Sequence, residues 1–164
     1  MTVERIPAAA SYALRHAVLR PNQDFDSVLW PGDEESGTAT FGAIEETAGA
    51  VVGVATVFRE PAPFDPVVVA LAGAVPELES AMWRLRGMAT RQDLQGRGIG
   101  TMVLGAALSH VVAEGGRLLW CNARVGAIAF YERAGFSTFG DEWVFPTVGP
   151  HVVMWRWIEP DAVT

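Results

Sequence analysis

The chain contains no lysine, and all 12 of its basic residues are arginines. This absence excludes lysine from every catalytic or phosphate-binding role, including that of the nucleotide-triphosphate loop, which requires Gly-Lys-Ser/Thr. Cysteine is almost absent as well, because Cys121 is the single one. One cysteine cannot crosslink the fold or build a thiolate metal site by itself, so we expect neither a disulfide framework nor a bound metal.

Long hydrophobic runs and an excess of positive charge are also missing. The longest apolar run spans residues 67–75, far short of the roughly 20 residues that a membrane helix needs. The first residues carry no basic start followed by an apolar stretch, so we expect a cytoplasmic protein without a secretory signal or a membrane span. The net charge of −7 argues against nucleic-acid binding, which depends on neutralising phosphates, and is compatible with an amine substrate.

The composition that remains is that of an ordinary globular protein. The 164 residues, of which 50% are hydrophobic, are enough for one domain with a substantial core, so we expect residues 1–164 to form a single domain. Hydrophobic periodicity predicts the order strand, helix, two strands, strand, helix, strand, helix and two strands. Such an order is typical of an α/β domain with a mixed sheet and a β-α-β unit in its middle.

The pattern assigns ranges to most of these elements. The predicted helices cover residues 8–19, 101–114 and 126–134, and the predicted strands cover 38–45, 50–59, 83–90, 117–122, 136–145 and 152–158. Residues 60–66 contain three prolines and indicate a loop, whereas 67–80 are apolar but interrupted by glycine and proline, and fit no single element. A turn over 147–150 separates the last two strands.

A glycine-rich loop lies between the strand at 83–90 and the helix at 101–114. It consists of Gln95, Gly96, Arg97, Gly98, Ile99 and Gly100. Three glycines in five positions let a backbone turn sharply and approach a ligand, and loop amides at a helix N-terminus form an anion site. By itself the loop is a weak signal, because a plain tight turn is the alternative and its spacing does not match the dinucleotide fingerprint.

The loop does not stand alone. It resembles the acyl-CoA-binding motif of the GNAT superfamily of N-acetyltransferases, Gln/Arg-x-x-Gly-x-Gly/Ala, through Gln95, Gly98 and Gly100. Residues 127–136 resemble the second signature of that family, Ala-Ile-x-hydrophobic-Tyr-x-x-x-Gly-Phe. The resemblance implies a GNAT-like α/β domain, whose mixed, mostly antiparallel sheet has a parallel pair at its centre and is flanked by helices. The two ends of the chain resemble a bacterial subgroup of undefined substrate.

The resemblance also implies a chemistry. The pyrophosphate of acetyl-CoA would rest on the amides of the loop, and its pantetheine arm would pair with Met88, Ala89 and Thr90. The N–H of Met88 or Ala89 would polarise the thioester carbonyl, as an oxyanion hole does. The amine attacks directly in this family, so no acyl-enzyme nucleophile is needed, and we expect Cys121 to be a buried strand residue.

Two further residues match positions that contact the cofactor in the family. Tyr131 matches the tyrosine near the CoA sulfur, where a phenol can protonate or hydrogen-bond the departing thiolate; the alternative is a ring that packs against Phe136. Arg124 occupies a position where many members carry an asparagine that contacts the cofactor or the next strand. Asn122 either substitutes for that asparagine or ends the strand.

The general base is less well marked. The central strand lacks the glutamate that many relatives carry, and His151 is the first candidate because an ordinary imidazole titrates near neutral pH. It falls in the Gly-Pro-His turn before the last strand, and a structural hydrogen-bonding role is the alternative. Glu142, Asp141 and Glu77 are weaker candidates.

The sequence does not identify the acceptor of the acetyl group. We expect a small-molecule primary amine; the alternatives are a protein N-terminus or side chain, or a CoA-binding module without catalysis. Trp30 and Trp143 either form the wall of an acceptor pocket, where an aromatic face can hold a cation, or pack in the core. Members of the family often dimerise through their terminal strands, so a homodimer is a further expectation.

Overall fold

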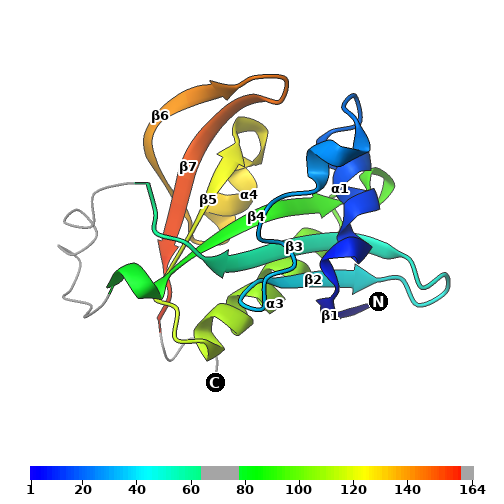
Figure 1. Cartoon of the computed structure of the whole chain (residues 1–164), viewed down its shortest axis with the longest axis horizontal. Coiled ribbons are helices and arrows are strands. Elements are labelled where there is room, and N and C mark those ends of the chain that lie inside the picture. The colour runs from blue at the N-terminus through cyan, green and yellow to red at the C-terminus, as the bar shows by residue number, and fades with distance from the viewer. Residues whose placement is uncertain (64–77, 160–164) are drawn as a thin grey trace. The chain divides into compact units, whose positions relative to one another are not determined.

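The computed structural model describes residues 1–63 and 78–159 (Figure 1). In this part of the chain, seven strands form one sheet in the order β1-β2-β3-β4-β5-β7-β6. One neighbouring pair, β4 and β5, is parallel, so the mixed, mostly antiparallel sheet expected from the sequence is confirmed. The chain divides into two compact units, which are described separately below: residues 1–58 and 85–110, and the described parts of 59–84 and 111–164.

The elements have the following bounds. The strands are β1 (Thr2–Ile6), β2 (Ala39–Ile44), β3 (Val51–Arg59), β4 (Met82–Thr90), β5 (Leu118–Arg124), β6 (Ser137–Phe145) and β7 (Gly149–Trp157). The α-helices are α1 (Tyr12–Leu19), α3 (Ile99–Ala113) and α4 (Ile128–Arg133). Short 3₁₀ turns are η1 (Ala8–Ser11), η2 (Phe25–Val28), η3 (Leu78–Ala81), η4 (Gln92–Leu94) and η5 (Val125–Ala127).

Most predicted elements are confirmed within a few residues, and four differ in detail. The helices expected at 8–19 and 126–134 each open with a 3₁₀ turn before the α-helix begins. The strand expected at 117–122 continues to Arg124. The last strand begins at Gly149, so the expectation that His151 lies in a turn is wrong. Most of the ambiguous segment 67–80 lies outside the described residues, which resume with η3 at Leu78.

The first unit is built on β1, β2 and β3, which pair antiparallel in chain order. β3 is rich in β-branched valines, which suit a buried pleated surface, and six of its nine residues are buried. Gly53 on β3 allows the first turn of α3 to come close, because a Cβ there would lie 2.5 Å from Cγ2 of Ile99. This contact fixes where α3 begins and therefore where the preceding loop is presented.

The second unit contains the antiparallel strands β5, β7 and β6, in that spatial order (Figure 1). Its core includes a cluster of buried side chains from η3, β4 and β5, namely Leu78, Met82, Leu118 and Trp120. Trp120 was expected to pack in the core, and it does so while its indole N–H donates to the carbonyl oxygen of Glu60 at 2.9 Å. Among the helices that the structure describes, none is long and apolar enough to cross a membrane.

Candidate active site

The glycine loop of the first unit presents its backbone to solvent. Residues 95–98 are exposed, and Gly96 and Gly98 have φ values of +78° and +85°. This left-handed region is readily available to glycine and costly for residues with a Cβ, so the sequence motif here encodes a backbone conformation. The amide of Met102 donates to the carbonyl oxygen of Gly98 at 3.1 Å, which marks the start of α3 directly after the loop.

Such a loop is suited to hold an anion. Amides that follow left-handed glycines and precede a helix converge on one side, where the helix dipole adds a partial positive charge. Among the described residues, chain neighbours aside, no atom lies within 4 Å of a Cβ built at Gly96 or Gly98, so the space beside both positions is open. Arg91, which could add charge, is engaged by Asp93 at 2.7 Å and by Glu45 at 3.6 Å. Arg97 is exposed on the loop itself.

The strand expected to line the ligand leads directly into this loop. Met88, Ala89 and Thr90 form the end of β4, and Ala89 is buried while its two neighbours are partly exposed. The side-chain amide of Gln95 donates to the carbonyl oxygen of Thr90 at 3.1 Å. This hydrogen bond ties the first residue of the motif to the end of the strand, so the loop and the strand edge hold a defined relation to each other.

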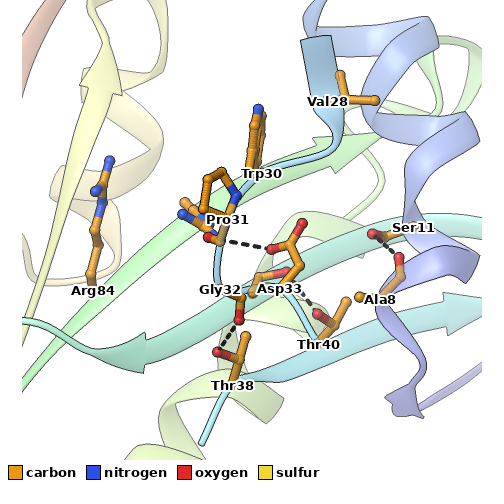
Figure 2. Close-up of polar contacts among 12 residues, drawn as sticks. Ala8, Ser11, Val28, Trp30, Pro31, Gly32, Asp33, Thr38, Thr40 and Arg84 are labelled. Carbon is orange, nitrogen blue, oxygen red and sulfur yellow. Dashed lines mark hydrogen bonds and ion pairs between the residues drawn. The ribbon is translucent and has the colours of Figure 1, made fainter. Parts of the chain in front are cut away.

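A buried polar cluster lies on the same unit, and the sequence patterns gave no sign of it. Arg15 on α1 is fully buried and pairs with Asp33, with Nη1–Oδ2 at 2.5 Å and Nη2–Oδ1 at 3.3 Å. Arg86 on β4 donates to the same carboxylate at 2.9 Å. Figure 2 shows Asp33 in the loop beside Pro31 and Gly32, with Thr40 on the neighbouring strand β2. Residues from three distant segments thereby share one carboxylate.

Trp30 lies in this cluster and not in an open pocket. Its ring centroid lies 4.4 Å from the guanidinium carbon of Arg15, 5.5 Å from that of Arg86 and 5.6 Å from that of Arg20. The indole N–H donates to the carbonyl oxygen of Ser27 at 2.9 Å. Because guanidinium groups already surround the ring, its aromatic surface is poorly placed to hold an acceptor ammonium group as well.

In the second unit, Tyr131 on α4 and Cys121 on β5 form a buried pair. Tyr131 packs its ring against Phe136 at 5.3 Å between centroids, and its phenol is hydrogen-bonded to the Cys121 thiol. Burial raises the pKa of Cys121 to about 12, and burial together with the thiol raises the pKa of Tyr131 well above its ordinary value. Both groups are therefore neutral near pH 7, and Cys121 is buried as expected.

His151 is held on β7 in a defined orientation. Its Nδ1 lies 2.8 Å from the carbonyl oxygen of Gly149, and since a carbonyl only accepts, Nδ1 carries the proton. In the neutral ring, Nε2 then holds the lone pair. The imidazole lies against Trp143 at 5.7 Å and Phe145 at 5.9 Å between ring centroids, and only 8% of the residue is exposed.

Register places Arg124 directly opposite His151 on the neighbouring strand β5, and Trp143 opposite it on β6. Direct partners in an antiparallel pair point to the same face, so these three side chains share one face of the second unit. The weaker base candidates Asp141 and Glu142 are exposed on β6, and Glu77 falls outside the described residues. The loop with Met88–Thr90 therefore belongs to the first unit, and Tyr131, Arg124 and His151 belong to the second.

A left-handed glycine loop at the start of a helix is an arrangement that can hold a phosphate group through backbone amides. The comparisons with known proteins name the family. The sequence profile of the Acetyltransferase (GNAT) family matches residues 11–136. The chain is also 28% identical over 157 residues to "Uncharacterized N-acetyltransferase YitI" of Bacillus subtilis (strain 168), with 95% of each protein covered.

Solved structures agree on the fold. The chain is similar to an aminoglycoside 6'-N-acetyltransferase complexed with coenzyme A, with a TM-score of 0.70, 13% identity and 98% of each chain covered. It is also similar to the ribosomal-protein-S18-alanine N-acetyltransferase from Escherichia coli, with a TM-score of 0.69, 16% identity, and 99% of this chain and 98% of that one covered. The chain belongs to the GNAT family and is an N-acetyltransferase.

Proposed function

We propose that the protein transfers the acetyl group of acetyl-CoA directly to the primary amine of a small molecule. The observation that carries this proposal is the exposed loop with left-handed glycines at 96 and 98, placed at the start of α3. Its open amides suit a pyrophosphate, and the loop is tied to β4 through Gln95 and Thr90. When bound, acetyl-CoA supplies an activated thioester.

His151 fits the role of general base. An amine must lose a proton before or during attack on a carbonyl, and a base must offer a lone pair to accept it. The hydrogen bond from Nδ1 to the Gly149 carbonyl fixes the ring so that Nε2 carries that lone pair. Arg124 is the direct partner of His151 on the neighbouring strand β5.

Tyr131 fits the role of hydrogen-bond donor to the departing thiolate. Because its pKa is raised well above the ordinary value, proton transfer from the phenol to a thiolate would be uphill. A neutral phenol still donates a hydrogen bond, which stabilises negative charge that develops on sulfur. The sequence left both protonation and hydrogen bonding open, and the direction of the pKa shift favours hydrogen bonding.

The acceptor class rests on charge and on the relatives. The net charge of −7 suits attraction of a cationic amine. Structurally similar proteins include an aminoglycoside acetyltransferase and an N-acyl amino acid synthase from uncultured soil microbes, whose names specify small amines. The N-terminal alanine of a ribosomal protein is the acceptor named for another neighbour, and it defines the competing possibility for this chain.

The test is a panel of acceptors with purified protein and acetyl-CoA, read by released CoA thiol and by the mass of the acetylated product. The panel includes amino acids, polyamines, aminoglycosides and a peptide with an N-terminal alanine. We expect turnover with at least one small amine. Turnover with the peptide alone would overturn the small-molecule assignment, and hydrolysis without an acetylated product would overturn acetyl transfer.

A further inference from the structure

Gly87 interrupts β4 immediately before Met88. Its φ is +68°, whereas the residues of a regular strand have negative φ. The φ and ψ angles of a residue set the direction of the peptide that follows it, which here contains the N–H of Met88. A left-handed residue within a strand re-aims the neighbouring groups, and such irregularities are frequent beside active sites. The orientation of the Met88 amide therefore depends on how firmly Gly87 is held.

Two side chains of the buried cluster pack directly on Gly87. A Cβ at this position would lie 2.8 Å from Nε of Arg15 and 3.2 Å from Cζ3 of Trp30. Both distances are shorter than ordinary van der Waals contact, so the guanidinium and the indole occupy the space that a side chain would fill. Gly87 is thus required twice, by its backbone angle and by the approach of Arg15.

Arg15 cannot easily move from this position. Its Nη1 and Nη2 bind the Asp33 carboxylate, Nη2 also donates to Oγ1 of Thr56 at 2.8 Å, and Nη1 donates to the carbonyl oxygen of Val28 at 3.3 Å. These partners come from η2, from the loop that carries Asp33 and from β3. The Nε that faces Gly87 is a buried atom without a hydrogen-bond partner among the described residues.

An unsatisfied buried N–H carries an energetic cost, and a side chain of this size in the core could have been apolar. Here the buried Nε–H of Arg15 instead lies against the backbone of Gly87. We propose that Arg15 is a positioning residue, which is locked by Asp33 and Thr56 and fixes the left-handed Gly87, so that the N–H of Met88 faces the acetyl carbonyl. This inference rests on the proposed function of acetyl transfer and adds a residue remote from the reacting atoms.

The experiment compares two ligands that differ only in the thioester. ¹⁵N-labelled protein is titrated with acetyl-CoA and, separately, with CoA, and the backbone amides of Gly98 and Met88 are followed by NMR. Gly98 reports the shared pyrophosphate. Met88 reports the carbonyl, because an amide proton moves downfield when it donates to an oxygen that CoA lacks. In the parent we expect Gly98 to respond to both ligands and Met88 to show an additional response to acetyl-CoA alone.

Two variants then weaken the hold of Arg15 on Gly87. Arg15→Lys keeps a positive charge for Asp33 but removes the guanidinium from Gly87, and Asp33→Asn keeps the size of the side chain but removes the charge that holds Arg15. The matched control is Arg20→Lys, because Arg20 also approaches Trp30 and donates to the carbonyl of Ser27, but it is not among the nearest contacts of Gly87. We expect both test variants to keep the Gly98 response and to lose most of the acetyl-specific response of Met88, while the control keeps both.

Kinetics provide a second reading that a purely structural role would not produce. With any acceptor that the panel identifies, kcat of the test variants should fall about tenfold while the Kd for acetyl-CoA stays within about threefold, because only the transition-state contact is weakened. An acetyl-specific Met88 response retained in full by both variants would overturn the inference, as would its absence from a parent whose Gly98 responds. A parent in which Gly98 responds to neither ligand would instead overturn the proposed function.

Discussion

The glycine loop and the Asp33 cluster lie on the same unit but differ in their exposure and in the type of group that they present. The loop at 95–98 is exposed, its functional groups are backbone amides, and the space beside its glycines is open. The cluster is buried, its functional groups are charged side chains, and Asp33 is only 5% exposed. The loop is free to bind a ligand, whereas the charged groups of the cluster bind mainly one another and are suited to hold backbone in place.

This difference predicts which property each region controls. A buried charge that loses its partner is left uncompensated in a poorly solvated environment, so changes in the cluster should affect folding first. An exposed loop contributes few packing contacts, so changes there should affect ligand binding with little loss of stability. The predictions below are ordered from the largest expected effect to the smallest.

The largest effect is expected from Arg15→Met, which leaves Asp33 buried with Arg86 as its remaining partner. Breaking a buried ion pair typically costs about 3–5 kcal/mol of unfolding free energy. The control is Arg20→Met, which loses a partly buried guanidinium that donates to the carbonyl of Ser27, and should cost about 1 kcal/mol. Urea denaturation of the three proteins measures the difference, and equal stabilities would show that the cluster is not a structural centre.

Cys121 and Tyr131 in the second unit form a buried pair that is neutral, in contrast to the charged Asp33 cluster. The pKa of Cys121 is raised from 9.0 to about 12 in the folded state, so the folded protein holds this proton more tightly. The protonated thiol therefore contributes fully to the free energy of unfolding below pH 9. This contribution, on the order of 4 kcal/mol, is lost as the pH rises toward 12. Cys121→Ala should flatten the fall of stability over this range, measured by urea denaturation at several pH values. An unchanged alkaline profile would contradict the role of burial.

His151→Gln tests the proposed base. If His151 accepts the proton of the amine, parental turnover should rise with pH through one ionisation, since an imidazole must be neutral to act. The variant should lose this rise, keep acetyl-CoA binding and turn over about 100-fold more slowly or worse. The acceptor amine also ionises, so both proteins are measured with one acceptor. A variant that keeps the rise and near-parental turnover would leave His151 as a strand residue that orients Trp143.

Tyr131→Phe tests the proposed donor to the thiolate. The ring and its contact with Phe136 remain, and only the phenol oxygen is lost. We expect turnover to fall about 100-fold with little change in the Kd for acetyl-CoA, because the hydrogen bond matters when charge develops on sulfur. Steady-state rates and calorimetry measure the two quantities. Unchanged turnover, with chemistry confirmed as the slow step by single-turnover rates, would return Tyr131 to a packing role.

The loop could be predicted from the sequence because glycine is itself the signal of a left-handed backbone, and the periodicities of 3.6 and 2 located most helices and strands. The cluster could not, because Arg15 and Asp33 are 18 residues apart and Arg86 lies 53 residues beyond Asp33, so no local spacing connects them. Ion pairs formed only by tertiary packing leave no motif in a single sequence.

The position of His151 was misassigned for a different reason. Pro150 beside a glycine indicated a turn, but proline is tolerated near the first residue of a strand, where its missing N–H removes no essential ladder bond. β7 begins at Gly149 and includes Pro150, and this register places Arg124 beside His151. The weakly alternating strand β1 likewise received no residue range, since its burial pattern shows only one buried residue of five.

The most direct test of the central claim is acetyl-CoA binding by three proteins, measured by calorimetry. Gly98→Val forces a β-branched residue into φ +85°, so the amides of the loop should no longer converge on the pyrophosphate. Gly105→Ala, on the exposed face of α3 where a Cβ meets nothing within 4 Å, adds a side chain to the same element without that strain. We predict micromolar binding by the parent, unchanged affinity for Gly105→Ala, and affinity weakened about tenfold or more for Gly98→Val with its melting temperature nearly unchanged. Parental affinity in Gly98→Val would contradict the assignment of this loop as the acetyl-CoA site.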